Sequence, residues 1–362
     1  MMKAWDETYL SRLEQSSSVR IPMIREAWKR SWDLLICIAK AVGTEVPSEL
    51  SLVAFGSLAR MEFTSESDLD WCLLVDGRAD ANHRQVQLRV QDALHGVAGI
   101  KDPNPTGAFG ALVFSHEVIH CVGGAQDTNA NLTRRMLLLI ESIELNDPAI
   151  DRPRSRLLRG ILQRYFEEEP RFPEKKFFPR FFLNDVVRFW RTMAVDFAAK
   201  THERGPQSWA LRNIKLRFSR KLLFVAGLLL CYETTLFPKS DLLSNDEGEL
   251  LFDEARPEFS STEHCLRASA LTPLEVLARA CLSLNIDSSV CEQIFSAYDG
   301  FLSILSDTQA RSHLATLNFE DATKSELFQR VRNLGHEFQA GLDKLFFGAK
   351  RMNELTLKYG VF

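Results

Sequence analysis

One segment of the chain, residues 52–75, restricts the fold more than any other. It reads LVAFGSLARMEFTSESDLDWCLLV, two apolar runs separated by a polar stretch that begins with Gly56 and Ser57. Short apolar runs bounded by turn residues are typical of buried strands. We therefore predict a strand, a Gly-Ser turn with one or two helical turns, a polar loop and a second strand, which together form part of a small sheet.

Two carboxylates stand at the start of the second predicted strand. Because successive side chains of a strand point to opposite faces, Asp68 and Asp70 should project together, with Leu69 and Trp71 buried on the other face. Neighbouring carboxylates repel each other, and hard divalent ions that bridge carboxylate and phosphate oxygens relieve this repulsion. The pair predicts a magnesium site with Asp68 and Asp70 as ligands.

The Gly-Ser turn has the residues that an anion site requires. Gly56 lets the backbone approach a bound group closely, and Ser57 adds a hydroxyl beside the backbone amides of a helical turn. A triphosphate would suit this arrangement. We assign Arg60, in the same segment, to nucleotide binding together with Gly56 and Ser57.

This motif resembles that of the DNA polymerase β-like nucleotidyltransferases. The signature is carried here by Phe55-Gly56-Ser57, ten further residues, and Asp68-Leu69-Asp70-Trp71. The resemblance covers about 25 residues well, and its form is most similar to the bacterial protein adenylyl- and uridylyl-transferases and the small MNT-type enzymes. It implies an enzyme of the EC 2.7.7 type that binds ATP or another nucleoside triphosphate with two Mg²⁺ ions, or Mn²⁺.

The same resemblance implies a reaction and roles for the motif. A nucleoside monophosphate passes to an acceptor hydroxyl and pyrophosphate leaves. Asp68 and Asp70 are then the catalytic metal ligands, and Gly56 and Ser57 cradle the β- and γ-phosphates. The acceptor stays open between a protein side chain, an RNA 3′ end, a small molecule and a second nucleotide.

A third carboxylate is normal in this family, on a neighbouring strand, and the sequence departs from that pattern. The next predicted strand, ALVF at residues 111–114, holds no acidic residue. Glu117 is our first candidate for a catalytic role, because the end of a strand can point it toward the pair. Asp102 and Asp127 are the alternatives. If none of them serves, the chain is a weak or inactive nucleotide-binding regulator or an antitoxin-like partner.

The sequence HEVIH at residues 116–120 offers a different interpretation. It matches the HExxH pattern of zinc proteases, with Glu141 as a conceivable third ligand. Such proteases carry the motif inside a long helix, whereas here a predicted strand precedes it and Gly123 and Gly124 follow. The pattern therefore favours two histidines near a strand end over a zinc site.

Helical periodicity dominates outside the predicted sheet. Apolar residues recur at helical spacing over residues 8–42, 84–94, 131–144, 181–200, 207–232 and in several stretches between 272 and 358. Residues 146–180 are rich in proline and charge, which is typical of a boundary. We predict an α+β nucleotidyltransferase domain, a small mixed sheet with flanking helices, over residues 1–145, a linker or hinge over 146–180, and an all-α helical domain over 181–362.

Basic residues gather in the first part of the predicted helical domain. Residues 171–221 hold thirteen basic and four acidic residues, in a chain whose net charge is -4. Arg188, Lys215 and Arg217 are our candidates for binding the triphosphate or the acceptor, and Arg134 and Arg135 are similar candidates on another helix. The alternative is a solvated helix surface with ion pairs along it.

Composition places the chain in a broad class. Its 362 residues and 45% hydrophobic content suffice for a sizeable core, and the slightly acidic balance does not indicate a general nucleic-acid binder. The seven cysteines are scattered without a CxxC pair, which fits a reducing compartment. No secretory signal or membrane-spanning run is evident. We therefore expect a cytoplasmic protein without a membrane partner.

Overall fold

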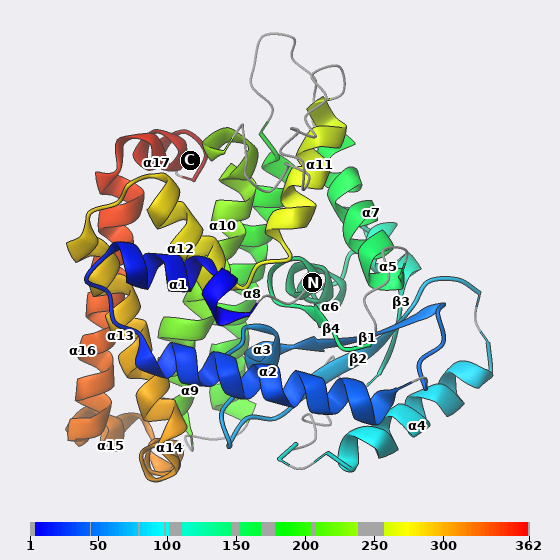
Figure 1. The fold of residues 1–362 in the computed structure, drawn as a ribbon, viewed down its shortest axis with the longest axis horizontal. Helices are drawn as coiled ribbons and strands as arrows, with labels where there is room; N and C mark the ends of the chain where they lie inside the picture. The colour runs from blue at the N-terminus through cyan, green and yellow to red at the C-terminus, as the bar shows by residue number, and fades with distance from the viewer. Residues whose placement is uncertain are drawn as a thin grey trace.

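A computed structural model places a small sheet beside a large set of helices (Figure 1). It describes residues 4–360 except 44, 79, 98, 101–110, 147–151, 168–177, 204–207 and 238–256. The four strands are β1 (Leu50–Phe55), β2 (Asp70–Val75), β3 (Leu112–Phe114) and β4 (Ile143–Glu144). Their order is β3-β2-β1-β4, with β1 antiparallel to both β2 and β4 and with β2 parallel to β3. The predicted mixed sheet is confirmed.

Helices cover the sheet, which explains why its central strands are apolar throughout. Every residue of β1 is buried, and in β2 only Asp70 is partly exposed. A strand that is covered on both faces reads as a continuous apolar run. The segments around the sheet are η1 (Trp5–Glu7), α1 (Tyr9–Ser16), α2 (Pro22–Val42), α3 (Gly56–Ala59), α4 (Asn82–His95), α5 (Ser115–Ile119), α6 (Asn129–Ile140) and α7 (Pro153–Glu167).

The rest of the described chain is helical, as predicted. Its segments are α8 (Arg180–Glu203), α9 (Trp209–Lys215), the π-helical η2 (Leu216–Arg220), α10 (Lys221–Leu236), α11 (Pro257–Ala268), α12 (Pro273–Ser283), α13 (Ser288–Ser306), α14 (Thr308–Thr316), α15 (Phe319–Lys324), α16 (Glu326–Asp343), η4 (Lys344–Gly348), α17 (Lys350–Leu355) and η5 (Thr356–Gly360). Apolar α10 lies in the middle of this region and packs against α8, α11 and α12. No helix among the described residues combines the length and the apolar character that a membrane crossing requires.

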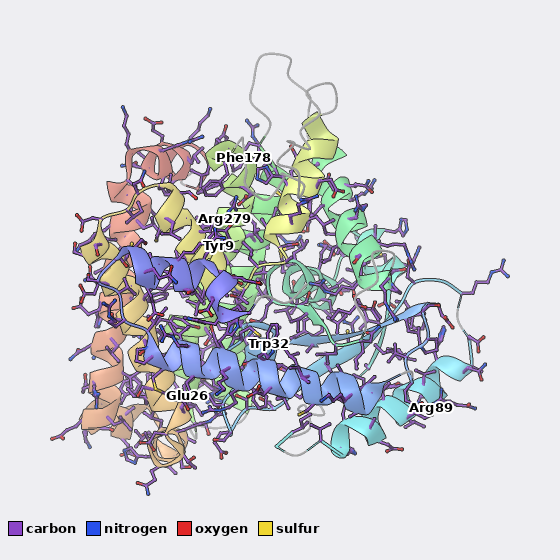
Figure 2. The ribbon with its side chains drawn as sticks, in the orientation of Figure 1. Tyr9, Glu26, Trp32, Arg89, Phe178 and Arg279 are labelled. Atoms are coloured by element: carbon purple, nitrogen blue, oxygen red, sulfur yellow. The ribbon has the colours of Figure 1, made fainter. Side chains whose placement is uncertain are left out.

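The N-terminal helices join the sheet to the helical region. Helix α1 packs on α12 and α2 packs on α13, and the backbone N–H of Ile24 donates to Asp299 Oδ1 at 2.9 Å. At the α1–α12 contact the Arg279 guanidinium lies 6.0 Å from the ring centre of Tyr9 (Figure 2). The buried apolar residues of both regions form one continuous core. The first 42 residues thus contact both predicted domains.

Two local predictions differ from the structure. Residues 131–144 were expected to be one helix, but α6 ends at Ile140 and the next residues turn to form β4. The predicted hinge, residues 146–180, contains the long helix α7, whose Leu157, Ile161 and Tyr165 are buried in the core. The position of the domain boundary stays a prediction.

Candidate nucleotide and metal site

The Gly-Ser turn lies where β1 ends and the short helix α3 begins. Gly56 has φ +70°, a conformation that residues with a side chain rarely adopt. A Cβ atom at this position would stand 2.9 Å from Asp70 Oδ2. Glycine is therefore required both for the backbone conformation and for the close approach of the turn to the carboxylate.

Strand pairing brings the two aspartates to this turn. Asp70 is the first residue of β2 and pairs with Phe55, the residue before Gly56. Leu69 and Trp71 are buried, as alternation requires, whereas Asp68 is exposed and Asp70 is partly buried. Burial, together with the negative charges of Asp68 and Glu141, raises the pKa of Asp70 to about 7.

A divalent cation fits this pair. Burial and the neighbouring carboxylates Asp68 and Glu141 disfavour the charged form of Asp70, a bound cation would favour it, and carboxylate oxygens are the ligands that Mg²⁺ prefers. Gly56 keeps Asp70 Oδ2 clear of a side chain. Within the described ranges no three His, Cys, Asp or Glu side chains are arranged to hold a metal, so Asp68 and Asp70 are the two protein ligands on offer.

Glu141 lies on the other side of the turn, a position that the sequence analysis considered only as a zinc ligand. The antiparallel pairing of Ala54 with Ile143 extends to place Glu141 opposite Gly56. The backbone N–H of Gly56 donates to Glu141 Oε1 at 2.8 Å, and Arg60 Nη1 donates to Oε2 at 2.7 Å. Both carboxylate oxygens are therefore occupied.

Arg60 and Glu62 extend this set of contacts away from the turn. Arg60 Nε donates to Glu62 Oε2 at 2.7 Å, and the hydroxyl of Tyr298 on α13 donates to Glu62 Oε1 at 2.9 Å. Burial by itself would lower the pKa of Arg60, but the charges of Glu62 and Glu141 outweigh it, and the pKa is raised well above its ordinary value. Arg60, predicted to bind the nucleotide, is held by two carboxylates.

Three cations from the helical region face the aspartate pair. Lys215 interacts electrostatically with Asp68, Arg220 with Asp70, and Arg311 with Asp68. Arg311 on α14 also donates to Thr64 Oγ1 at 3.1 Å and to the carbonyl oxygen of Glu66 at 2.6 Å. Burial lowers the pKa of Lys215 to about 8, and Arg311 contributes to this lowering. Arg220 and Arg311 were not among the predicted site residues.

The π-helical segment η2 explains which cations reach the site. Residues five apart point to different sides of an α-helix, but a π-helix closes each turn at i+5. Lys215 and Arg220 therefore point to the same side, whereas Arg217 bonds Asn213 Oδ1 at 2.8 Å and has its pKa lowered by burial and by Arg332. The structure brings Lys215 to the aspartates and turns Arg217 toward another helix.

The predicted cations on other helices belong to a separate cluster. Arg135 is fully buried and bonds Asp127 at 2.9 Å and Asp185 at 2.8 Å. Arg188 lies 2.7 Å from Asp185 and 3.5 Å from Asp127. Arg134 lies 3.4 Å from Glu117. None of these contacts involves Asp68 or Asp70.

The three predicted candidates for the third carboxylate have different positions. Glu117 on α5 is more than half exposed and its described partner is Arg134. Asp127 is buried against Arg135, and its pKa is lowered, since the hydrogen bonds from Arg135 and from the Gly123 N–H outweigh the effect of burial. Asp102 lies outside the described residues. The structure does not bring Glu117 or Asp127 into contact with the aspartate pair.

The HEVIH motif lies at a short turn of helix. Helix α5 has five residues and ends at Ile119, before the second histidine. The rings of His116 and His120 lie 4.9 Å apart, centre to centre, and Glu141 is bonded to Gly56 and Arg60. The motif therefore lacks the long helix on which zinc proteases carry it.

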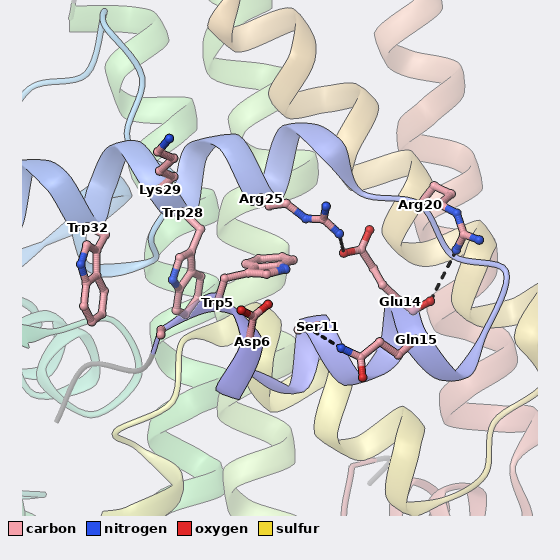
Figure 3. Close-up of a pocket in the computed structure, with 11 residues that line it drawn as sticks. Trp5, Asp6, Ser11, Glu14, Gln15, Arg20, Arg25, Trp28, Lys29 and Trp32 are labelled. Atoms are coloured by element: carbon pink, nitrogen blue, oxygen red, sulfur yellow. Dashed lines mark hydrogen bonds and ion pairs between the residues drawn. The ribbon is translucent and has the colours of Figure 1, made fainter.

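A groove of about 630 Å³ lies elsewhere, between α1 and α2 (Figure 3). Trp5, Trp28 and Trp32 line it, and Arg25 pairs with Glu14 at its edge. None of the residues assigned above to the nucleotide and metal site lines this groove.

Comparison with known proteins agrees with the geometry. Residues 15–100 match a family described as "Putative nucleotidyltransferase DUF294", and this range contains β1, the Gly-Ser turn, both aspartates and α4. The nucleotidyltransferase-like superfamily is confirmed. The match supports nucleotidyl transfer as the general activity and does not distinguish the branch. No curated protein matches the chain.

Proposed function

We propose that this protein is a magnesium-dependent nucleotidyltransferase that transfers a nucleoside monophosphate from a nucleoside triphosphate to an acceptor hydroxyl and releases pyrophosphate. One observation carries the proposal. The left-handed Gly56 turn stands against Asp70, while Lys215, Arg220 and Arg311 approach the same carboxylates from the helical region. Carboxylates for a metal and cations for phosphates thus occur together beside a turn without a side chain.

Each group has a defined task in this reaction. Asp68 and Asp70 would hold the magnesium, which when bound lowers the pKa of the acceptor hydroxyl and neutralises the triphosphate. Gly56 and Ser57 form the turn on which the phosphates rest. Lys215 and Arg220 add positive charge where pyrophosphate would develop and leave.

Labelled nucleotides test this proposal directly. The purified full chain is incubated with each α-labelled nucleoside triphosphate, magnesium and a cell lysate, and the label is followed into protein, RNA and small-molecule fractions. Asp70→Asn serves as the control. Transfer by the wild type alone supports the proposal and names the acceptor class, whereas equal labelling with Asp70→Asn contradicts it.

A second candidate, an inactive nucleotide-binding regulator or an antitoxin-like partner, is favoured by one observation. Both oxygens of Glu141 accept hydrogen bonds from Gly56 and Arg60, which leaves Asp68 and Asp70 as the carboxylates of the described site without a bonded partner. This candidate predicts magnesium-dependent binding of a triphosphate without pyrophosphate release. A coupled pyrophosphate assay with the same lysate separates the two.

A further inference from the structure

We propose that Glu141, Arg60, Glu62 and Tyr298 form a positioning chain that fixes the Gly56 turn for phosphate binding. In this proposal, which rests on the proposed function, Glu141 acts on the backbone of the turn and not as a third metal ligand. The chain runs from Gly56 N–H to Glu141, from Glu141 to Arg60, from Arg60 to Glu62, and from Glu62 to the hydroxyl of Tyr298.

In this chain every carboxylate oxygen accepts one hydrogen bond. Glu141 uses one oxygen for Gly56 and the other for Arg60, and Glu62 uses one for Arg60 and the other for Tyr298. All four distances lie between 2.7 and 2.9 Å. Each of these oxygens keeps a second lone pair, so a positioning role and metal ligation are told apart by the metal-binding test below.

Because the chain of hydrogen bonds is buried, loss of one bond affects the neighbouring bonds. The side chains of Glu62 and Glu141 are 2% exposed and that of Arg60 is 10% exposed, and Tyr298 is fully buried. Water cannot readily replace a lost partner at such positions, so a buried group that loses its partner must move or remain unsatisfied. A change at Tyr298 should therefore reach Gly56 through Glu62, Arg60 and Glu141.

The far end of the chain connects the turn to the helices that carry the cations. Tyr298 belongs to α13, and its hydroxyl also shares a hydrogen bond with Ser219. Ser219 lies in η2 next to Arg220, which interacts with Asp70. The chain thus fixes the phosphate turn relative to the segment that supplies positive charge to the same site.

The backbone N–H of Gly56, which donates to Glu141, gives a readout that does not depend on activity. We would label the glycines of the intact protein with ¹⁵N and measure hydrogen exchange of the Gly56 amide. Tyr298→Phe removes only the distant hydroxyl, and we expect it to speed exchange at Gly56 by about tenfold. Tyr165→Phe is the matched control, because its buried hydroxyl donates to Asp185 at 2.6 Å in a separate cluster, and it should leave Gly56 exchange unchanged.

Metal binding distinguishes a positioning role from ligation. Mn²⁺ binding, followed by electron paramagnetic resonance, should weaken at least tenfold in Asp70→Asn and change less than about threefold in Glu141→Ala. The affinity of Glu141→Ala for a magnesium-bound triphosphate should nevertheless fall by about tenfold, because the turn is no longer held. Loss of Mn²⁺ in Glu141→Ala as large as in Asp70→Asn would make Glu141 a ligand and overturn the proposal.

The two proposals fail separately. If the wild type binds none of ATP, GTP, CTP and UTP with magnesium, the proposed function fails, and the Gly56 exchange rates still test whether the chain exists. If the wild type binds a triphosphate but Tyr298→Phe exchanges at Gly56 like the wild type, the positioning chain is wrong and the proposed function stands.

Discussion

Two charge clusters, each with buried members, lie along helix α6 and differ in how their charges are paired. At its middle, Arg135 joins Arg188, Asp127 and Asp185, two cations with two carboxylates. Just past its end, Glu141 lies near Glu62, Asp68 and Asp70, four carboxylates of which Glu62 and Glu141 are bonded to Arg60. The first cluster is balanced by bonded ion pairs, whereas Asp68 and Asp70 of the second have no bonded cation among the described contacts and interact only electrostatically with Lys215, Arg220 and Arg311. In this sense we call the second cluster unbalanced.

This difference separates a structural cluster from a binding site. Arg135 is fully buried and also bonds the hydroxyl of Tyr165 at 2.7 Å and the carbonyl oxygen of Val118 at 3.3 Å, so it connects α5, α7 and α8 without needing another ion. The second cluster opens at Asp68 and meets Lys215 and Arg311. Buried charges must be compensated. In the second cluster, beside the Gly56 turn, a bound metal cation would compensate the carboxylates, and a polyanion would compensate the nearby cations.

The largest effect is expected at the unbalanced cluster. Asp70→Asn should lower nucleotidyl transfer by at least about a thousandfold, because it removes a metal ligand that holds the reacting groups. It should leave the melting temperature near that of the wild type, since the charge removed has no full compensation in the fold. Activity and thermal unfolding measured on one preparation check both expectations, and wild-type turnover would remove Asp70 from the site.

The balanced cluster should respond in the opposite way. Arg135→Met removes the fully buried partner of Asp127 and Asp185 and leaves them only Arg188, so we expect a loss of about 3 kcal/mol in the free energy of unfolding. Triphosphate affinity of the molecules that remain folded should change little, because no contact of Arg135 involves the aspartate pair. Urea unfolding gives the free energy of unfolding, and binding titrations give the dissociation constant for the triphosphate. A selective loss of binding with unchanged stability would reverse the assignment of the two clusters.

Much of the unbalanced cluster could be predicted from the sequence because its parts are local. The strands on both sides of the Gly-Ser turn, and the alternation that buries Leu69 and Trp71, follow from apolar patterns within 25 residues. The superfamily and the mixed sheet with its helical region are confirmed. The roles of Asp68 and Asp70 remain predictions with a geometry that fits them.

The missed residues depend on contacts that a local pattern does not contain. Glu141 reaches Gly56 because β4 pairs with β1. Strand β4 has two residues and closely follows helix α6, and the helical spacing of apolar residues continues across it, so the sequence pattern does not reveal the strand. Arg220 lies in the π-helical η2 and interacts with Asp70, whereas the sequence analysis, which assumed a regular α-helix, selected Arg217 from the same stretch. Both errors come from the assumption of regular α-helix where the backbone departs from it.

The cations near the aspartate pair permit a test with a smaller expected effect. Lys215→Ala and Arg220→Ala should each raise the dissociation constant for a magnesium triphosphate by about tenfold, because they remove charge that faces Asp68 and Asp70. Two arginine variants serve as controls: Arg217→Ala, from the same segment as Arg220, and Arg188→Ala, from the balanced cluster. Their dissociation constants should stay within about twofold of the wild-type value. If Arg217→Ala loses as much as Arg220→Ala, then the π-helix does not select between them.

The smallest effect concerns acid, and it tests the balanced cluster. The pKa of Asp127 is lowered in the folded protein, since hydrogen bonds from Arg135 and from the Gly123 N–H outweigh the effect of burial. A carboxylate with a lowered folded pKa contributes stability above its unfolded pKa of about 4, and this contribution is lost as the pH falls through the folded value. The free energy of unfolding should therefore decrease below about pH 4 in the wild type.

Asp127→Asn lacks this titration, so it should be less stable than the wild type at pH 7 and lose less stability on acidification. Asp33→Asn, at an exposed position on helix α2, is the comparison that accounts for removal of one negative charge. Parallel curves for Asp127→Asn and the wild type would show that the ion pair with Arg135 contributes nothing to stability, and the balance of charges would then not explain why this cluster is buried.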